Sequence, residues 1–202
     1  MEGSSAIIKV LQFLQHVDKD VTLAVNSCHC PASDVFWNVM SHVQIWYVLY
    51  LAVIVLLIWR LGWKKGLVAV GACVLMVVAC DQLGNLVKDA VCRLRPLHDL
   101  EMVSRGLHIL EPADEHLYGF FSAHAANTMG FAVCSSICLC NDKKHSYKAY
   151  YAGIAVWAVL VGISRVFVGK HFVGDVLAGW FVGILLGAAF GLVASYIIKK
   201  VK

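Results

Sequence analysis

The 202-residue sequence carries too little charge for a soluble domain of its size. Asp, Glu, Lys and Arg make up 15% of the chain, whereas 60% of it is hydrophobic and the mean hydropathy is +0.73. This composition indicates an integral membrane protein. The formal net charge of +4 is too small to indicate binding to nucleic acid. No internal repeat or linker divides the chain, so residues 1–202 are expected to form one domain.

The sequence also lacks the features of a secretory leader and of a zinc site. Its first residues include Glu2 and no basic stretch, so no cleavable signal peptide is expected. Of the eight cysteines, only Cys28 and Cys30 flank a second type of ligand, His29. The second ligand pair that a zinc site requires is missing, so this cluster is not expected to bind metal.

Long apolar runs predict an all-α, polytopic membrane bundle of about five transmembrane helices. About 20 residues cross the hydrocarbon layer, and suitable runs lie at roughly 40–60, 66–91, 122–140, 147–166 and 174–198. Residues 5–17 form a shorter amphipathic stretch, which is expected to be a helix in the membrane interface. Asp18, Lys19 and Asp20 are expected to interrupt it. Pro31 and Ser33 then predict a turn and the start of a helix.

Basic residues predict the orientation of this bundle. The turn at 60–65, the turn at 141–148 and the C-terminus each carry three basic residues and fall on one side of a five-span topology. The positive-inside rule makes that side cytoplasmic. The N-terminus and the segments 89–121 and 165–172 are then expected on the opposite, extracytoplasmic face.

A stripe of glycines occupies the last expected span, at every fourth position from Gly179 to Gly191. Small residues at this spacing predict close packing of one helix on another. The same stripe is compatible with a homodimer.

The segment 164–175 carries Ser164, Arg165, His171 and Asp175 between long apolar runs. His171 and Asp175 are four residues apart, so a helix would set them on one face. A carboxylate in that position can hold an imidazole in one tautomer and stabilise its charged form. This arrangement is typical of a histidine used in nucleophilic or acid–base catalysis.

Two further segments are expected to join this one. In the first, Lys88 and Arg95 are seven residues apart and are expected to share a helix face, with Arg93 pointing elsewhere. Paired cations at the membrane edge suit an anion, because Arg can bind phosphate through two parallel hydrogen bonds. Anchors that bind lipid headgroups would leave the same pattern.

The second of these segments runs from Phe121 to His124, at the expected start of a helix. Free backbone N–H groups and the helix dipole favour an anion there. Ser122 adds a hydroxyl donor, and His124 is placed to give a proton to a bound group. An N-cap serine beside an interfacial histidine is the alternative.

The remaining polar residues are less specific. Asp81, within the second apolar run, is either a functional residue or a hydrogen-bonded structural carboxylate. Four residues of the outer loop are predicted to be solvated: His108, Glu111, Glu115 and His116.

The three segments together resemble the type 2 phosphatidic acid phosphatase superfamily. The pattern reads Lys88-x6-Arg95-Pro96, then Ser122-x-His124, then Ser164-Arg165-x5-His171-x3-Asp175. The five-span layout is similar to that of the membrane-bound bacterial members. Two residues depart from the family pattern, because Phe121 and Ala123 stand where the second motif usually has proline and glycine.

The resemblance implies a role for each of these residues. His171 would be the nucleophile that forms a phosphohistidine, Asp175 would orient it, and His124 would be the general acid and then the base. A further set would bind the phosphate: Lys88, Arg95, Ser122, Ala123, Ser164 and Arg165. The resemblance implies no metal and no other cofactor.

The expected function is that of a lipid phosphate phosphatase acting at the outer face of the bacterial inner membrane. Undecaprenyl pyrophosphate is the favoured substrate, with lipid A phosphates and phosphatidylglycerol phosphate as alternatives. Two other functions fit the same residues. One is a non-catalytic carrier or flippase for lipid phosphates, and the other is a metal site formed by His124, His171 and Asp175.

Overall fold

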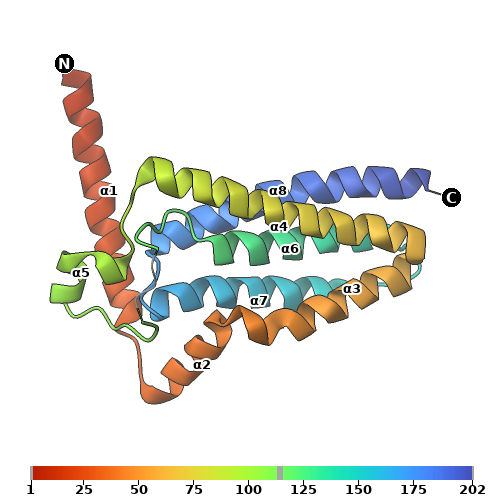
Figure 1. The fold of residues 1–202 in the computed structure, drawn as a ribbon, viewed down its shortest axis with the longest axis horizontal. Coiled ribbons are helices and arrows are strands. Elements are labelled where there is room, and N and C mark those ends of the chain that lie inside the picture. The colour runs from red at the N-terminus through yellow and green to blue at the C-terminus, as the bar shows by residue number, and fades with distance from the viewer. Residues whose placement is uncertain (1, 113–115, 202) are drawn as a thin grey trace.

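The computed structural model describes residues 2–112 and 116–201, and helices make up most of it (Figure 1). Five long helices form a bundle: α3 (Tyr47–Leu61), α4 (Trp63–Val91), α6 (Ala123–Leu139), α7 (Lys148–Phe167) and α8 (Val173–Lys200). Four segments, which contain all of these helices except α6, are long and apolar enough to cross a membrane. Helix α6 has 17 residues, and it packs against α4, α7 and α8 in the middle of the bundle. The predicted helical membrane bundle is confirmed.

The close approach of α8 to α6 depends on the glycine stripe. A Cβ atom at Gly183 would lie 2.4 Å from the carbonyl oxygen of Ala126, and one at Gly187 would lie 2.5 Å from that of Gly130. Both distances are far below van der Waals contact, so any larger residue would push the two helices apart. The stripe therefore serves packing within the chain.

The first expected span is divided into separate helices. Helix α2 (Pro31–Ser41) ends before His42, whose backbone is extended, and a short 3-10 helix η1 (Val43–Trp46) leads into α3. Pro31 occupies the first turn of α2, and Cys30 and Ser33 form its capping box. The predicted helix start at this proline is confirmed.

Helix α1 (Glu2–Asn26) lies across one end of the bundle, steeply inclined to the long helices (Figure 1). This orientation and its exposed apolar residues, among them Ile7 and Phe13, suit a helix in the membrane interface. The predicted interruption of this helix is wrong. Its three central charges are instead paired with the loop after α4: Asp18 with Arg93, Lys19 with Asp99, and Asp20 with Arg105.

The polar segments meet at the end of the bundle that α1 crosses (Figure 1). The loop between α4 and α6 carries η2 (Pro96–His98) and α5 (Leu100–Ser104). It returns beside its own start through a bridge between Leu94 and Tyr118. The α7–α8 connection lies at the same end, whereas the C-terminus and the α3–α4 and α6–α7 turns lie at the other. The polar segments and the basic turns are thus at opposite ends.

Candidate active site

A cavity of about 480 Å³ lies between the loop after α4 and the ends of α4, α6 and α7. Residues from all three predicted segments line it: Lys88, Arg95, Ala123, His124, Arg165 and His171. The wall also contains seven residues that were not predicted for the site: Ser41, His42, Val43, Gln44, Glu111, His116 and Lys170. Four basic side chains therefore face one polar cavity, although their segments are far apart in the sequence.

His171 lines the buried edge of this cavity, and Asp175 lies behind it. Their side chains are 3% and 0% exposed, and 3.5 Å separates His171 Nδ1 from Asp175 Oδ2. Asp175 Oδ2 also accepts a hydrogen bond of 3.0 Å from the backbone N–H of Phe172. The Nδ1–Oδ2 separation exceeds an ordinary hydrogen bond, and catalytic contacts of this kind often tighten when substrate binds.

The surroundings of His171 keep its imidazole neutral. Burial, followed by the guanidinium groups of Arg165 and Arg95, holds the pKa of His171 well below its ordinary value of 6.5. A neutral ring keeps the lone pair that a nucleophile needs. Since Nδ1 faces Asp175, Nε2 is the nitrogen on the opposite edge of the ring.

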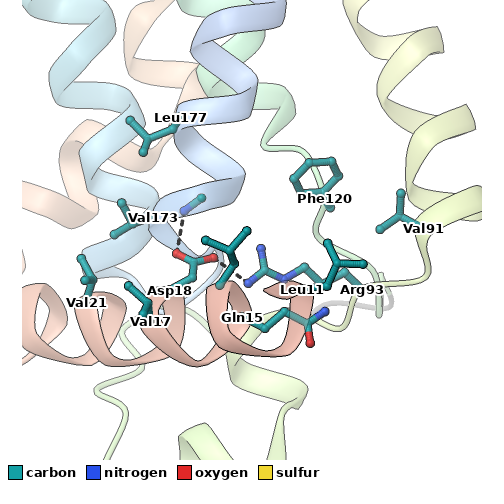
Figure 2. Close-up of a pocket in the computed structure, with 12 residues that line it drawn as sticks. Leu11, Gln15, Val17, Asp18, Val21, Val91, Arg93, Phe120, Val173 and Leu177 are labelled. Carbon is teal, nitrogen blue, oxygen red and sulfur yellow. Dashed lines mark hydrogen bonds and ion pairs between the residues drawn. The ribbon is translucent and has the colours of Figure 1, made fainter. Parts of the chain in front are cut away.

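Arg93 points away from the cavity, as predicted, but it points toward Asp175, which the sequence did not indicate. Its Nη1 lies 2.7 Å from Asp175 Oδ1, and its Nη2 lies 2.6 Å from Asp18 Oδ2. Figure 2 shows Arg93 and Asp18 between α1 and the start of α8, where Asp18 Oδ1 accepts a 2.8 Å hydrogen bond from the Gly174 N–H. The guanidinium also lies 4.1 Å from the centre of the Phe172 ring. Arg93 therefore links α1 to the buried carboxylate.

Lys88 and Arg95 do not reach the cavity from a shared helix face, so that part of the prediction is wrong. Helix α4 ends at Val91, and Cys92 has a left-handed backbone with φ of 51°. Arg95 lies beyond the helix, where its backbone N–H donates a 2.9 Å hydrogen bond to the carbonyl oxygen of Leu117. This pairing of the two ends of the loop brings Arg95 to the cavity beside Lys88.

The start of α6 supplies Ala123 and His124 to the cavity wall, whereas Ser122 lies behind it. Ser122 is the fully buried N-cap residue of α6, and its Oγ accepts a hydrogen bond from a backbone N–H of the first turn. Its own N–H donates to the carbonyl oxygen of Asp175 at 3.0 Å, which fixes α6 against α8. Ser164 is also buried, and its Oγ donates to the carbonyl oxygen three residues earlier at 2.7 Å. Both hydroxyl groups thus bond to the backbone.

Glu111 occupies part of the cavity, and the prediction that it is solvated is wrong. Its side chain is 14% exposed, with Oε2 2.9 Å from Lys170 Nζ and Oε1 3.5 Å from Arg165 Nη1. The Ser41 hydroxyl donates a further hydrogen bond to this carboxylate. Burial alone would raise the pKa of Glu111, but the charge of Arg165 and the hydrogen bonds from Ser41 and Lys170 hold it below its ordinary value. A negative group therefore lies against the cations that suit an anionic substrate.

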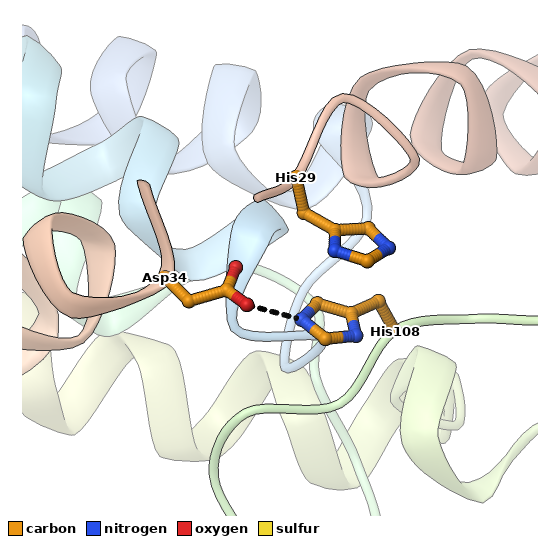
Figure 3. A group of neighbouring side chains, drawn as sticks. All are labelled: His29, Asp34 and His108. Carbon is orange, nitrogen blue, oxygen red and sulfur yellow. Dashed lines mark hydrogen bonds and ion pairs between the residues drawn. The ribbon is translucent and has the colours of Figure 1, made fainter. Parts of the chain in front are cut away.

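Outside the cavity, His29, Asp34 and His108 gather where the α1–α2 turn meets the loop after α5 (Figure 3). His108 Nε2 lies 3.1 Å from Asp34 Oδ2, so His108 is paired and partly buried rather than solvated. The rings of His29 and His108 stack, with centroids 3.6 Å apart and an interplanar angle of 6°. In-plane lone pairs of parallel rings do not converge, so a metal ion would require one ring to turn. Glu115, also predicted as solvated, lies outside the described residues.

The cavity is suited to moving a phosphoryl group. A neutral histidine beside a carboxylate can accept the group, a second histidine can move a proton, and the cations can hold phosphate oxygens. In a bundle with helices able to cross a bilayer, these features define an integral membrane phosphatase. Residues 66–199 match the PAP2 superfamily, and the chain belongs to that family, as its three motifs predicted. It is a hydrolase that acts on lipid phosphates.

Two lipid A 4'-phosphatases are similar to this chain. The protein from Bacteroides thetaiotaomicron is 27% identical over 194 residues, which cover 96% of this chain and 84% of the relative. The protein from Porphyromonas gingivalis is 28% identical over 180 residues, which cover 88% of this chain and 72% of the relative. These bacterial relatives and the apolar helices support a bacterial membrane as the location of the chain.

The fold is similar to the crystal structure of a transmembrane PAP2-type phosphatidylglycerolphosphate phosphatase from Bacillus subtilis. The TM-score is 0.68 with 22% sequence identity, and the match covers 94% of this chain and 88% of the other. At this identity the likeness concerns the fold of the helical bundle.

Proposed function

We propose that this protein removes a phosphate monoester group from a lipid of the lipid A kind, through a phosphohistidine formed on His171. The observation that supports this most directly is the position of His171, buried beside Asp175 in the wall of a cavity with four basic side chains. The activity named for the two bacterial relatives supports the lipid A assignment.

In the first step, Nε2 of His171 attacks the phosphorus atom and the bond from phosphorus to the lipid oxygen breaks. His124 donates a proton to this oxygen, which leaves as the hydroxyl group of the lipid. Lys88, Arg95 and Arg165 hold the non-bridging oxygens and stabilise their charge as the bond breaks. Lys170 lines the same cavity and adds a fourth positive charge.

In the second step, His124 accepts a proton from a water molecule whose oxygen attacks the phosphohistidine. The phosphorus–nitrogen bond breaks, so that inorganic phosphate is released and His171 is neutral again. Asp175 stabilises the positive charge that His171 carries while it is phosphorylated, and Arg93 holds Asp175 in place. This cycle requires no metal ion or other cofactor.

The residues at the helix ends support this chemistry from the cavity wall and from behind it. The backbone N–H of Ala123 belongs to the first turn of α6, which favours an anion, and Ala123 lines the cavity. Ser122 and Ser164 act by fixing the ends of α6 and α7, since their hydroxyl groups bond to the backbone.

The location that fits this function is the inner membrane, with the cavity at the periplasmic side. The basic turns lie at the opposite end of the bundle, which the positive-inside rule assigns to the cytoplasm. The phosphate group would bind at the interface while the lipid tails stay among the helices.

We also propose that residues 1–202 act as a single domain. A homodimer, where it forms, would use a surface other than the glycine stripe, because those glycines face α6.

Phosphate release from purified lipids in detergent tests the proposal. The panel contains lipid A, undecaprenyl pyrophosphate and phosphatidylglycerol phosphate. We expect release from lipid A, and no release from the folded His171→Ala variant. A preference for undecaprenyl pyrophosphate would support the substrate favoured by the sequence and contradict the lipid A assignment.

The same variant and a metal chelator separate the competing functions. A lipid-phosphate carrier would keep its transport activity in His171→Ala. A metal site formed by His124, His171 and Asp175 would lose activity in EDTA and regain it with zinc. Either result would contradict the proposed chemistry.

A further inference from the structure

A second cavity, of about 560 Å³, runs along the membrane-embedded part of α3, α4 and α6. Val43, Ala123 and His124 line both this cavity and the catalytic one, so the two meet at the general acid. Most of its wall is apolar, as expected for a groove that holds a lipid chain, and includes Tyr47, Leu57, Val77 and Phe131. A lipid whose phosphate binds beside His124 can therefore place a chain in this groove.

The groove contains one polar pair that the proposed chemistry does not use. Asn127 Nδ2 donates a hydrogen bond of 2.8 Å to Asp81 Oδ1, and both residues line the cavity. Asn127 Oδ1 is buried and has no hydrogen-bond partner among the described residues. The nearby Thr128 hydroxyl does not supply one, because it donates to the carbonyl oxygen of His124 at 2.8 Å.

The depth of this pair matches the start of a lipid chain. Asn127 follows His124 by one turn of α6, about 4.5 Å further into the membrane at 1.5 Å per residue. Asp81 precedes Lys88 by two turns of α4, about 10 Å further into the membrane. The pair therefore lies beside the first atoms of a chain whose phosphate ester is at His124.

Polar groups at this depth are unfavourable unless they are hydrogen-bonded. The pair offers acceptor oxygens, one of them without a partner, so an occupant with a hydrogen-bond donor would satisfy it. An unsubstituted acyl or prenyl chain has no donor and would leave the acceptor buried and unpaired. Sites built to bond a polar group discriminate strongly against analogues that lack it.

We propose that Asp81 and Asn127 form a subsite for a hydroxyl or amide N–H group near the head of the lipid chain. The substrate class is then a lipid phosphate with a hydroxyacyl or N-linked acyl chain. This inference rests on the proposed function, because it assigns the groove to the lipid whose phosphate His171 attacks.

Matched synthetic lipids test this subsite. One pair is a lysophosphatidic acid with a tetradecanoyl chain and its 3-hydroxytetradecanoyl counterpart, and a second pair has an ester-linked and an amide-linked tetradecanoyl chain. We expect kcat/KM to be about 10- to 100-fold higher for the donor-bearing member of at least one pair, from the contribution of a buried hydrogen bond. Equal values within both pairs would overturn the subsite.

Two variants connect the preference to the pair. Asn127→Leu removes the unpaired acceptor. In this variant the ratio of kcat/KM between the donor-bearing and the donor-free lipid is expected to be close to one. Val74→Leu, which changes an apolar residue of the same groove, is expected to leave the ratio unchanged. A ratio that persists in Asn127→Leu would overturn the assignment. The wild-type comparison decides the preference even where a variant does not fold.

The outcomes also separate this inference from the function on which it rests. If the wild-type protein hydrolyses both members of each pair equally, the phosphatase chemistry stands and the subsite fails. If it hydrolyses none of these synthetic lipids and no lipid A, the proposed function itself fails.

Discussion

Replacing Arg93 with glutamine would remove the cation that faces the buried carboxylate of Asp175. The two side chains are 18% and 0% exposed, and their atoms approach to 2.7 Å. Without Arg93, Oδ1 of Asp175 would lose its charged partner while the carboxylate stays buried. Removing one member of a buried ion pair costs about 3–5 kcal/mol. Because Arg93 is partly exposed, we expect the free energy of unfolding of Arg93→Gln to fall by an amount near the lower limit, about 3 kcal/mol.

The same change is expected to slow catalysis. A carboxylate without its cation either takes up a proton or moves, and in both cases it stabilises the charged form of His171 less well. Hydrogen bonds to charged groups contribute about 1.5–3 kcal/mol, so kcat should fall roughly 10- to 100-fold. Arg93→Lys keeps the charge without the two-pronged geometry and should give an intermediate rate.

Thermal unfolding and phosphate release in the same detergent measure both effects. Arg105→Gln is a matched control, because Arg105 pairs with Asp20 of α1 at 2.6 Å, but these side chains are 36% and 46% exposed. An exposed pair of this kind contributes little, so the control should keep the stability and turnover of the wild type. Wild-type stability and kcat in Arg93→Gln would refute a positioning role for this arginine.

Three further predictions follow from the cavity. Glu111→Gln removes a carboxylate that competes with phosphate for Lys170 and Arg165. Inorganic phosphate should therefore inhibit the variant roughly tenfold more strongly than the wild type. Unchanged or weaker inhibition would contradict this competition. Because the folded-state pKa of His171 lies well below 6.5, kcat/KM should hold at pH 6.5 and fall only at a clearly lower pH, where the folded protein itself takes up the proton. Stability should begin to decrease earlier, as the pH drops below about 6.5, because the unfolded chain takes up the proton more readily. A pH titration of both quantities checks this, and an acid limb above pH 7 would be inconsistent with a neutral nucleophile. Ala123→Gly restores the usual family residue in the cavity wall and should preserve or raise turnover, whereas a loss of more than about tenfold, near 1.4 kcal/mol, would argue against contact between this amide and phosphate.

The bundle and the meeting of its polar segments could be predicted because they depend on local sequence. Apolar runs of about 20 residues specify spans, and the basic turns 60–65 and 141–148 specify which ends lie together. With that topology, His171, His124 and Lys88 have to gather at one end of the bundle.

The missed features depend on contacts between residues far apart in the sequence. Asp18 looked like an interruption of the first helix, because its partner Arg93 lies 75 residues away. Glu111 looked solvated for the same reason, since Arg165 and Lys170 meet it only in the folded chain. A charged residue in an otherwise regular helical pattern is therefore as consistent with a distant partner as with a helix end.

The end of α4 before Arg95 could not be predicted from the local sequence. The seven-residue spacing from Lys88 instead suggested one continuous helix. The left-handed residue that ends this helix is Cys92, not glycine, so the usual stop signal was missing.

Trapping of the phosphorylated protein tests the central claim most directly. The wild-type protein would be mixed with lipid A labelled with ³²P in its phosphate groups, quenched in alkali after a fraction of a turnover, and mapped by proteolysis. The account predicts a label that is stable to base, labile to acid and attached to the peptide that contains His171. Turnover without any labelled protein, or a label on another residue, would contradict it.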